Sequence, residues 1–371
     1  MTEPIQGRKS DHIRIALEED VEVQPNSAFG RARLIYQAIP EIHRDDIDPS
    51  IEFLGRKLAF PLLIGSMTGG TKDAAIINQR LARAAQRCGI GMGLGSQRIM
   101  LEQPTTSATF QVRDVAPDIL LVANLGAVQL NYGVGAESIQ QLIRSVDADA
   151  LVFHLNAAQE AAQPEGDTRF GDLIPVLRRT IEELELPCGL KEVGCGFSID
   201  AARKLATLPL GFVESAGQGG TSWTRIEHMR SASEKPTAAM EQLEEWGIPS
   251  ITSLLSCLRY GGQIPVVASG GLRTGVEAAH AVAMGAQATA MALPLLRAAA
   301  ESEDAVYDAL MAFRSSFVTA MFLTGSTNIQ ALQKAQLSIA PDCFPEVFEG
   351  RASPEQLWTL ATPTLEDEPN Q

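Results

Sequence analysis

The feature of this sequence that most constrains its fold is a repeated alternation of short apolar runs with segments of helical periodicity. Eight such units follow one another, and each apolar run ends in a polar or glycine-rich stretch before the helical segment begins. Strand–loop–helix units in series favour a parallel sheet that closes on itself, with functional loops at the carboxyl ends of the strands. The sequence therefore predicts an α/β fold of the (β/α)8 TIM-barrel type. The predicted strands are residues 61–65, 90–94, 119–123, 150–155, 187–193, 210–214, 264–268 and 286–291.

The chain of 371 residues is predicted to form a single domain, because barrels of this kind often reach this length with additions. Residues 1–60 would form an N-terminal extension, residues 61–312 the barrel, and residues 313–371 C-terminal helices and a loose tail. Residues 1–27 contain a short helical run and otherwise have the character of a tail.

Three other segments lie outside the regular alternation. Residues 29–39 can form a strand, and residues 53–60 read as a connection with a turn at Gly55. A long insertion, residues 215–262, follows the sixth strand and includes a polar helix near Ala238–Trp246. Long loops inside compact domains usually serve as lids or binding segments.

The net charge of −15 argues against nucleic acid as a partner, because the surface would repel a polyphosphate backbone. An anionic ligand would need a local cluster of cations or a metal ion to hold it. The five cysteines are odd in number and contain no Cys-x-x-Cys pair, which fits a reduced, cytoplasmic protein. We expect no membrane association, because the longest uncharged run, residues 281–296, is short for a membrane span.

Glycine-rich exits follow three neighbouring strands near the end of the predicted barrel. Residues 269–273 follow the seventh strand, Ala292 and Leu293 follow the eighth, and residues 217–221 open the insertion. Glycines let main-chain N–H groups approach a phosphate, and a helix N-terminus adds positive potential. The alternative is that these glycines only make tight turns. The clustering of the three exits favours a phosphate site.

Polar residues at other strand ends would lie on the same rim and could hydrogen-bond a flat heteroaromatic ring. Lys191 is the most informative of them, because a lysine at the end of a buried strand is either paired with an acid, here Glu192, or held for a ligand anion. An electron-rich ring carrying negative charge would use this lysine. The remaining members of the set are Ser66, Met67, Thr68, Ser96 and Asn124.

Four polar residues follow the fourth strand within seven positions: His154, Asn156, Gln159 and Glu160. They could form a hydrogen-bonded rim network without chemistry, but such a cluster is costly unless it binds something. Glu160 is a candidate ligand for Mg²⁺, which typically takes one or two carboxylates and fills its shell with water and phosphate oxygens. A diphosphate would then be held by Mg²⁺ together with His154 and the cations Arg8, Lys9 and Arg98.

Several motifs together resemble the type 2 isopentenyl diphosphate isomerases, a family of FMN-dependent barrel enzymes of isoprenoid synthesis. The resemblance spans nearly the whole chain and includes Arg8-Lys9-x-x-His12, residues 67–70, 95–98, 123–126, His154-Leu155-Asn156-x-x-Gln159-Glu160, and residues 191–194, 219–223 and 269–273. It implies an enzyme that interconverts isopentenyl diphosphate and dimethylallyl diphosphate by a 1,3-allylic proton shift. It also implies reduced FMN, with NADPH or NADH as the reductant, Mg²⁺, and a homo-oligomer, tetrameric or octameric.

The resemblance also assigns roles to residues. FMN would be bound by Ser66, Met67, Thr68, Ser96, Asn124, Lys191, Thr221, Gly271, Leu272, Arg273, Ala292 and Leu293. The substrate would be bound by Arg8, Lys9, Ser96, Gln97, Arg98 and Gln159, with Glu160 on the metal. The candidate catalytic residues are Gln159, Lys191, Glu227 and His154.

Two alternatives stay open from the residues alone. An FMN-dependent oxidoreductase of the 2-hydroxy-acid oxidase or inosine-monophosphate dehydrogenase type would share the barrel and the cofactor. The former needs a histidine after the seventh strand, where residues 269–271 stand, and the latter a cysteine after the sixth, where the loop has none. A non-catalytic barrel that binds a phosphometabolite would keep the phosphate site and would not need Gln159 or Glu160.

Overall fold

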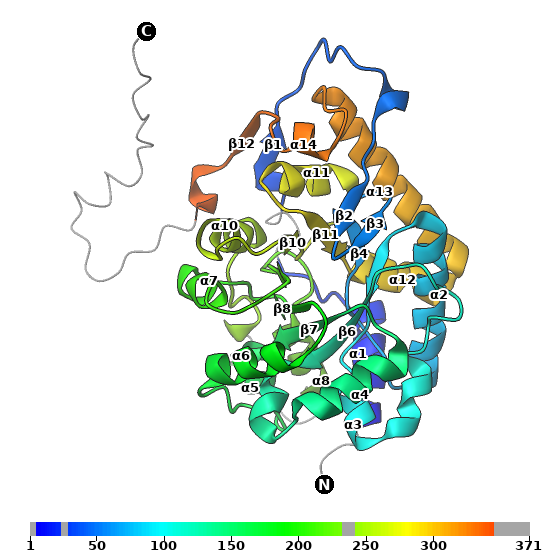
Figure 1. Cartoon of the computed structure of the whole chain (residues 1–371), viewed down its shortest axis with the longest axis vertical. Coiled ribbons are helices and arrows are strands. Elements are labelled where there is room, and N and C mark those ends of the chain that lie inside the picture. The colour runs from blue at the N-terminus through cyan, green and yellow to red at the C-terminus, as the bar shows by residue number, and fades with distance from the viewer. Residues whose placement is uncertain (1–4, 24–28, 232–241, 345–371) are drawn as a thin grey trace, which may run out of the picture.

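Eight parallel strands close into a barrel in this computed structural model, which describes residues 5–23, 29–231 and 242–344 (Figure 1). The strands follow the chain order around the barrel from β4 to β11, and β10 pairs in parallel with both of its neighbours, β9 and β11. The (β/α)8 prediction is therefore confirmed. The strands are β4 (Leu62–Ile64), β5 (Gly91–Gly93), β6 (Leu121–Gly126), β7 (Ala150–Leu155), β8 (Cys188–Glu192), β9 (Phe212–Glu214), β10 (Val266–Ala268) and β11 (Ala288–Met291).

Helices lie outside the strands, as the 3.6-residue periodicity of the intervening segments indicates. Thr71 caps the first of them by accepting from the N–H of Ala74, and Gly89 ends it with a left-handed residue (φ 65°). The barrel helices are α2 (Lys72–Cys88), α3 (Arg98–Glu102), α4 (Ala136–Val146), α5 (Ala157–Ala162), α6 (Leu173–Glu183), α7 (Ile199–Leu205), α8 (Trp223–Ser231), α10 (Ser250–Tyr260), α11 (Gly275–Ala283) and α12 (Leu293–Glu301). Short 3₁₀ turns are Phe29–Arg31, Arg44–Asp46, Pro104–Thr109, Ala127–Tyr132 and Pro341–Cys343.

The interior of the barrel is filled by apolar side chains and is closed at the amino ends of the strands by a hairpin, β2 (Ile51–Phe53) with β3 (Arg56–Leu58). Phe53 packs edge-on against Phe212, with ring centroids 5.9 Å apart. The sequence reading of residues 53–60 as a bare connection was therefore incomplete, because the turn at Gly55 joins two paired strands. This floor leaves the carboxyl ends of the strands as the open end of the barrel.

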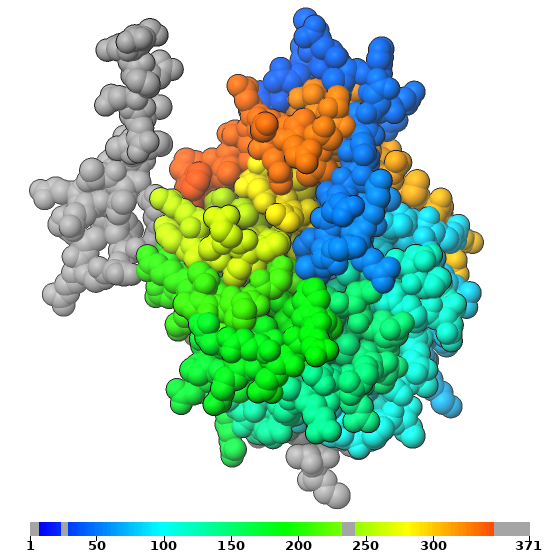
Figure 2. Space-filling model, in the orientation of Figure 1, coloured from blue at the N-terminus to red at the C-terminus, as the bar shows by residue number. Residues whose placement is uncertain are grey.

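The N- and C-terminal segments meet on the outside of the barrel, where Figure 2 shows the blue and orange residues side by side. Strand β1 (Ala32–Leu34) pairs antiparallel with β12 (Leu337–Ile339), so the strand predicted over residues 29–39 is much shorter than expected. The remaining C-terminal helices are α13 (Glu303–Leu323) and α14 (Ile329–Leu332). Helix α13 continues across the predicted boundary at residues 312 and 313.

Helix α13 is, among the described residues, the one helix long and apolar enough to cross a membrane by length and composition. It packs against α2, α11 and α12, which makes it a member of the helical shell. Among its described residues, the insertion predicted after the sixth strand includes helices α8 and α10. The polar helix predicted near Ala238–Trp246 lies in part outside the described residues. The predicted loose tail lies wholly outside them.

A first prediction concerns the contact between α11 and α13. A Cβ atom on Gly275 would lie 2.1 Å from the carbonyl oxygen of Phe313 and 2.4 Å from the nitrogen of Phe317. Replacing Gly275 by Ala should lower the free energy of unfolding by about 2 kcal/mol, because two backbones must move apart. Urea denaturation measures the change. Gly30→Ala is the matched control, because no atom lies within 4 Å of its added Cβ; equal effects of the two changes would contradict the prediction.

Candidate active site

A cavity of about 250 Å³ opens at the carboxyl ends of the barrel strands, where polar side chains from most of the strand exits converge. Nearly all of the residues predicted to bind ligand line this cavity. They are Arg8, Lys9, Ser66, Met67, Thr68, Ser96, Arg98, Asn124, His154, Gln159, Glu160, Lys191, Thr221, Gly271, Leu272, Arg273, Ala292 and Leu293. The barrel therefore brings into one site residues that lie as far apart in sequence as positions 8 and 293.

Two predicted site residues, Gln97 and Glu227, do not line the cavity. Gln97 is fully buried, its Oε1 accepts from the N–H of Asn124, and its Nε2 donates to Sδ of Met100. The N–H of Gln97 is also used, because it donates to the carbonyl of Asn124. The structure therefore places Gln97 behind the cavity wall, where its side chain supports Asn124.

Helix α1 (Ile5–Glu18) forms one wall of the cavity, so the N-terminal residues are not a tail in this structure. Lys9 holds the helix in place by donating to the carbonyls of Gly69 and Ser96, both at 2.8 Å. Burial, with a smaller effect of the neighbouring Arg8, lowers the pKa of Lys9 to about 7. Because a neutral amine still has two N–H groups, both hydrogen bonds persist when Lys9 loses its proton. Arg8 and Lys9 thus line the cavity of their own chain.

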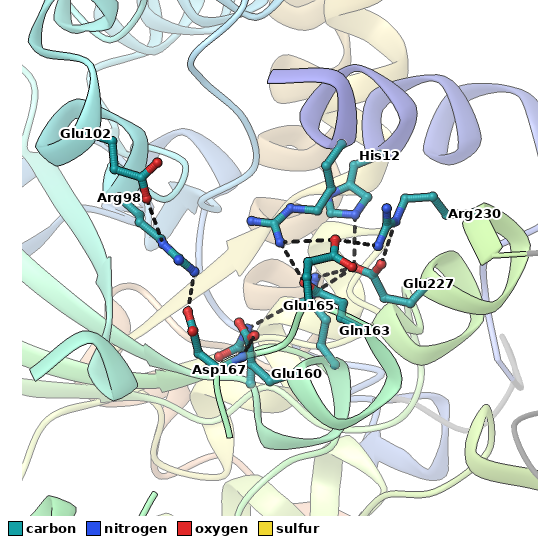
Figure 3. A network of polar contacts seen from close by, with 12 residues as sticks. His12, Arg98, Glu102, Glu160, Gln163, Glu165, Asp167, Glu227 and Arg230 are labelled. Atoms are coloured by element: carbon teal, nitrogen blue, oxygen red, sulfur yellow. Dashed lines mark hydrogen bonds and ion pairs between the residues drawn. The ribbon is translucent and has the colours of Figure 1, made fainter. Parts of the chain in front are cut away.

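Glu227 lies beneath this helix and is fully buried (Figure 3). Its Oε1 lies 2.9 Å from Nε2 of His12 and accepts from the amides of Gln159 (2.8 Å) and Gln163 (3.0 Å). Its Oε2 accepts from Nε of Arg230 at 2.9 Å. Burial alone would raise the pKa of Glu227, but the hydrogen bonds and the charge of His12 lower it to about 2. Glu227 is therefore ionised near neutral pH.

His154 has a fixed tautomer. The amide nitrogen of Asn124 donates to the carbonyl of Leu94, so Oδ1 of Asn124 is an acceptor. This oxygen lies 2.8 Å from Nδ1 of His154. Nδ1 must then carry the proton of the neutral ring, and Nε2 is an acceptor. Burial, and then the charges of Lys191 and Lys9, lower the pKa of His154 to about 3. A neutral ring with this tautomer has no N–H for a phosphate, which argues against the predicted contact of His154 with the diphosphate.

Lys191 is buried, and its ammonium group has no hydrogen-bond partner in the described part of the chain. The sequence left open that Lys191 pairs with Glu192, but the carboxylate of Glu192 has other partners. Oε2 of Glu192 accepts from three consecutive main-chain N–H groups, those of Gly194 (2.7 Å), Cys195 and Gly196 (2.8 Å). An unpaired cation in the wall of a cavity is costly without an anion, so the geometry favours a bound ligand at Lys191.

Three main-chain N–H groups at the glycine-rich exits, those of Gly220, Gly271 and Leu272, have no hydrogen-bond acceptor among the described residues. Gly271 adopts a left-handed conformation (φ 87°), and a Cβ on Gly220 would lie 2.8 Å from the nitrogen of Gly271. We call these three groups the phosphate cradle, because free N–H groups in close backbone contact bind phosphate oxygens. The N–H groups of Arg273 and Thr274, just before α11, are not available, since Glu277 accepts from both.

The carboxylate of Glu160 is almost completely buried and already has two partners. Its Oε1 accepts from Asn156 at 2.8 Å, and its Oε2 accepts from the N–H of Asp167 at 2.7 Å. Asp167 itself is engaged by Arg98, as Figure 3 shows, and it accepts from Gln129. The described residues hold no group of three His, Cys, Asp or Glu side chains that could bind a metal ion. A metal at Glu160 would therefore take most of its ligands from substrate oxygens and water.

Several residues of this site were missed in the sequence reading. Gln163, Glu165, Asp167 and Arg230 complete the network around Glu227 and Arg98, as Figure 3 shows. Arg8 donates to Oε1 of Gln163 at 2.8 Å, and Arg230 donates to Glu165 at 2.8 Å. None of them follows a strand directly, and no local pattern marks them as different from solvated loop residues.

Comparison with known proteins gives two kinds of similarity. Residues 242–339 match the family described as FMN-dependent dehydrogenase. The chain is 44% identical over 329 residues to an isopentenyl-diphosphate delta-isomerase of Nostoc sp., covering 88% of this chain and 94% of that protein. It is 43% identical over 333 residues to the protein of that name from Rickettsia akari, covering 90% and 97%.

Solved structures of mandelate oxidase share the fold. One variant of that enzyme, solved with benzaldehyde, gives a TM-score of 0.64 at 18% sequence identity, covering 89% of this chain and 94% of the oxidase. At this identity the similarity concerns the fold alone.

A second prediction follows from the lowered pKa of Lys9. Between about pH 7 and pH 10 the folded protein has lost the Lys9 proton while the unfolded chain keeps it, so the free energy of unfolding rises with pH. Lys9→Met should remove this contribution, which reaches about 1.4 kcal/mol per pH unit. Urea denaturation of both proteins across this range, without ligand, measures the difference. Parallel pH dependences for the two proteins would contradict the lowered pKa.

Proposed function

The chain belongs to the type 2, FMN-dependent isopentenyl-diphosphate delta-isomerases, and from this premise we propose that the barrel mouth is its active site. The protein is an enzyme that interconverts isopentenyl diphosphate and dimethylallyl diphosphate. The observation that carries the proposal is the presence, in one cavity, of the phosphate cradle and the buried, unpaired ammonium of Lys191. A cofactor with a phosphate at one end and an electron-rich ring at the other satisfies both.

FMN fits this cavity on the free donors alone. Its phosphate would accept from the cradle of Gly220, Gly271 and Leu272 and would lie near Arg273, and its ring would lie across the strand exits. The other residues proposed to hold it are Ser66, Met67, Thr68, Ser96, Asn124, Lys191, Thr221, Ala292 and Leu293. Bound in its reduced form, FMN supplies an electron-rich ring and an exchangeable proton beside the substrate.

The side chains around the ring have distinct tasks in this proposal. Lys191 places a positive charge where the ring would carry a negative one, and its burial strengthens that interaction. Gln159 has both ends of its amide fixed, since Nε2 donates to Glu227 and Oε1 accepts from Asn156 at 3.2 Å. It can therefore hold the reacting carbon chain or a proton in one orientation. His154 supplies an uncharged acceptor next to Lys191.

Glu227 acts in this scheme by positioning other groups. A carboxylate with a pKa of about 2, hydrogen bonds to three donors and an ion-pair contact with His12 does not take up a proton readily near neutral pH. Its part in catalysis is to orient Gln159 and to hold His12, which attaches α1 to the cavity. The geometry favours this positioning role over a relay of protons through Glu227.

The diphosphate requires local positive charge, because the chain as a whole carries −15. Arg8, Lys9 and Arg98 reach the cavity from two different elements, and each is now engaged by carbonyl, amide or carboxylate oxygens. We propose that the diphosphate, with Mg²⁺ bound at Glu160, takes over part of these contacts. Ser96 and Gln159 would complete the substrate site. We further expect NADPH or NADH as the reductant, a cytoplasmic location and a homo-oligomer.

A third prediction tests the active site through Lys191. Full-length protein should be yellow, lose its colour with NADPH, and convert isopentenyl diphosphate only when the flavin is reduced. Lys191→Ala should lose most of this activity, about 100-fold or more, because the charge that favours the electron-rich ring is gone. Lys57→Ala, an exposed residue at the opposite end of the barrel, is the control. Normal turnover by the Lys191 variant, or turnover with oxidised flavin alone, would overturn the proposal.

A fourth prediction tests the metal. Glu160→Gln should raise the Mg²⁺ concentration needed for half-maximal activity by about ten-fold or more, because a neutral amide is a weaker ligand for a hard cation. Wild-type protein should lose activity in EDTA and regain it with Mg²⁺. The exposed Glu52→Gln variant controls for loss of charge. The same Mg²⁺ titration for wild type and the Glu160 variant would show that Glu160 does not bind the ion.

A further inference from the structure

An acidic residue, Glu22, lies directly behind the phosphate cradle. It belongs to a short segment, residues 21–23, that follows α1 and pairs with residues 220–222 through a bridge between Glu22 and Thr221. Val23 donates to the carbonyl of Gly220 at 3.1 Å, and Ser222 donates to the carbonyl of Val21 at 2.9 Å. The backbone of Glu22 is thus fixed to the loop that supplies one side of the cradle.

The side chain of Glu22 forms an ion pair with Nη2 of Arg273, and both of the atoms in contact are shielded from solvent. The same nitrogen lies at the cradle, 3.6 Å from the position that a Cβ on Gly220 would occupy. Arg273 lines the cavity, whereas Glu22 does not. One guanidinium nitrogen therefore faces a fixed carboxylate on one side and the phosphate position on the other.

We propose that Glu22 sets the affinity of the enzyme for FMN by competing with the cofactor phosphate for Arg273. The inference rests on the proposed FMN site and adds a residue outside the cavity wall to it. Without a phosphate, Glu22 neutralises the charge of a partly buried arginine, whose other terminal nitrogen, Nη1, donates to the carbonyl of Leu272. With a phosphate bound, two anions share one guanidinium and repel each other.

The main-chain pairing makes this repulsion persistent. Glu22 cannot withdraw its backbone from the cradle without breaking the hydrogen bonds of residues 21–23 to residues 220–222. Its own carbonyl is also held, because Nη1 of Arg225 donates to it at 3.1 Å. The carboxylate therefore stays close to the phosphate position, and the binding of FMN carries a fixed electrostatic cost that the binding of riboflavin, which has no phosphate, does not carry.

The fifth prediction compares FMN with riboflavin. The full chain and its variants are titrated with each flavin, and binding is followed by the quenching of flavin fluorescence. Glu22→Gln should lower the Kd for FMN by about five-fold while leaving the Kd for riboflavin unchanged, because only the phosphate meets the removed charge. Glu22→Asp, which draws the carboxylate back by one methylene, should have a smaller effect in the same direction. Arg273→Gln should raise the Kd for FMN.

The control is Glu19→Gln, which removes an exposed carboxylate close by in the sequence and should change neither Kd. An unchanged or higher Kd for FMN in both Glu22 variants, or equal tightening of FMN and riboflavin, would overturn the inference. Those results leave the proposed function intact, because wild-type protein still binds FMN. If wild-type protein bound neither flavin, the proposed function would fail and this inference with it.

Discussion

The buried carboxylate of Glu227 is the interaction on which the barrel mouth depends. A charge in this position is tolerated only because four donors from three separate segments surround it. Those donors include His12 of the N-terminal helix and Gln159 of α5, which follows β7, so compensation of one charge joins a remote helix to the rim of the cavity. Removal of Glu227 would leave the donors unpaired and free the helix that closes the cavity.

In the proposed site, main-chain N–H groups of two loops would bind the phosphate. Helix α11 begins beside the cavity, and the capping box at its start satisfies the N–H groups of Thr274 and Glu277. The free donors belong to the loop residues just before that helix and to Gly220 across from them. Main-chain donors carry no net charge. In a chain with a large negative charge, they would recognise a phosphate through directed hydrogen bonds.

The cations of the site, apart from Lys191, have a common property: each contacts an oxygen atom of the chain itself. Arg98 contacts Asp167, Arg273 contacts Glu22, and Arg8 contacts Gln163. Pairing of this kind stabilises the folded chain, because an isolated buried cation is costly. In the proposed mode of binding, an incoming diphosphate or flavin phosphate would exchange partners with these groups, so the acids behind the cations would influence its affinity.

The barrel and most of the residues that line its mouth can be predicted from the amino-acid sequence, because apolar runs and their polar exits are local patterns that do not depend on distant partners. His154, Lys191 and the glycines of residues 269–271 are examples. Three other relations become visible only in the folded chain: α1 covers the cavity, Gln97 faces away from it, and Glu22 contacts Arg273. These relations join segments up to about 250 residues apart, and no local periodicity encodes which donor will reach which acceptor once the barrel has closed.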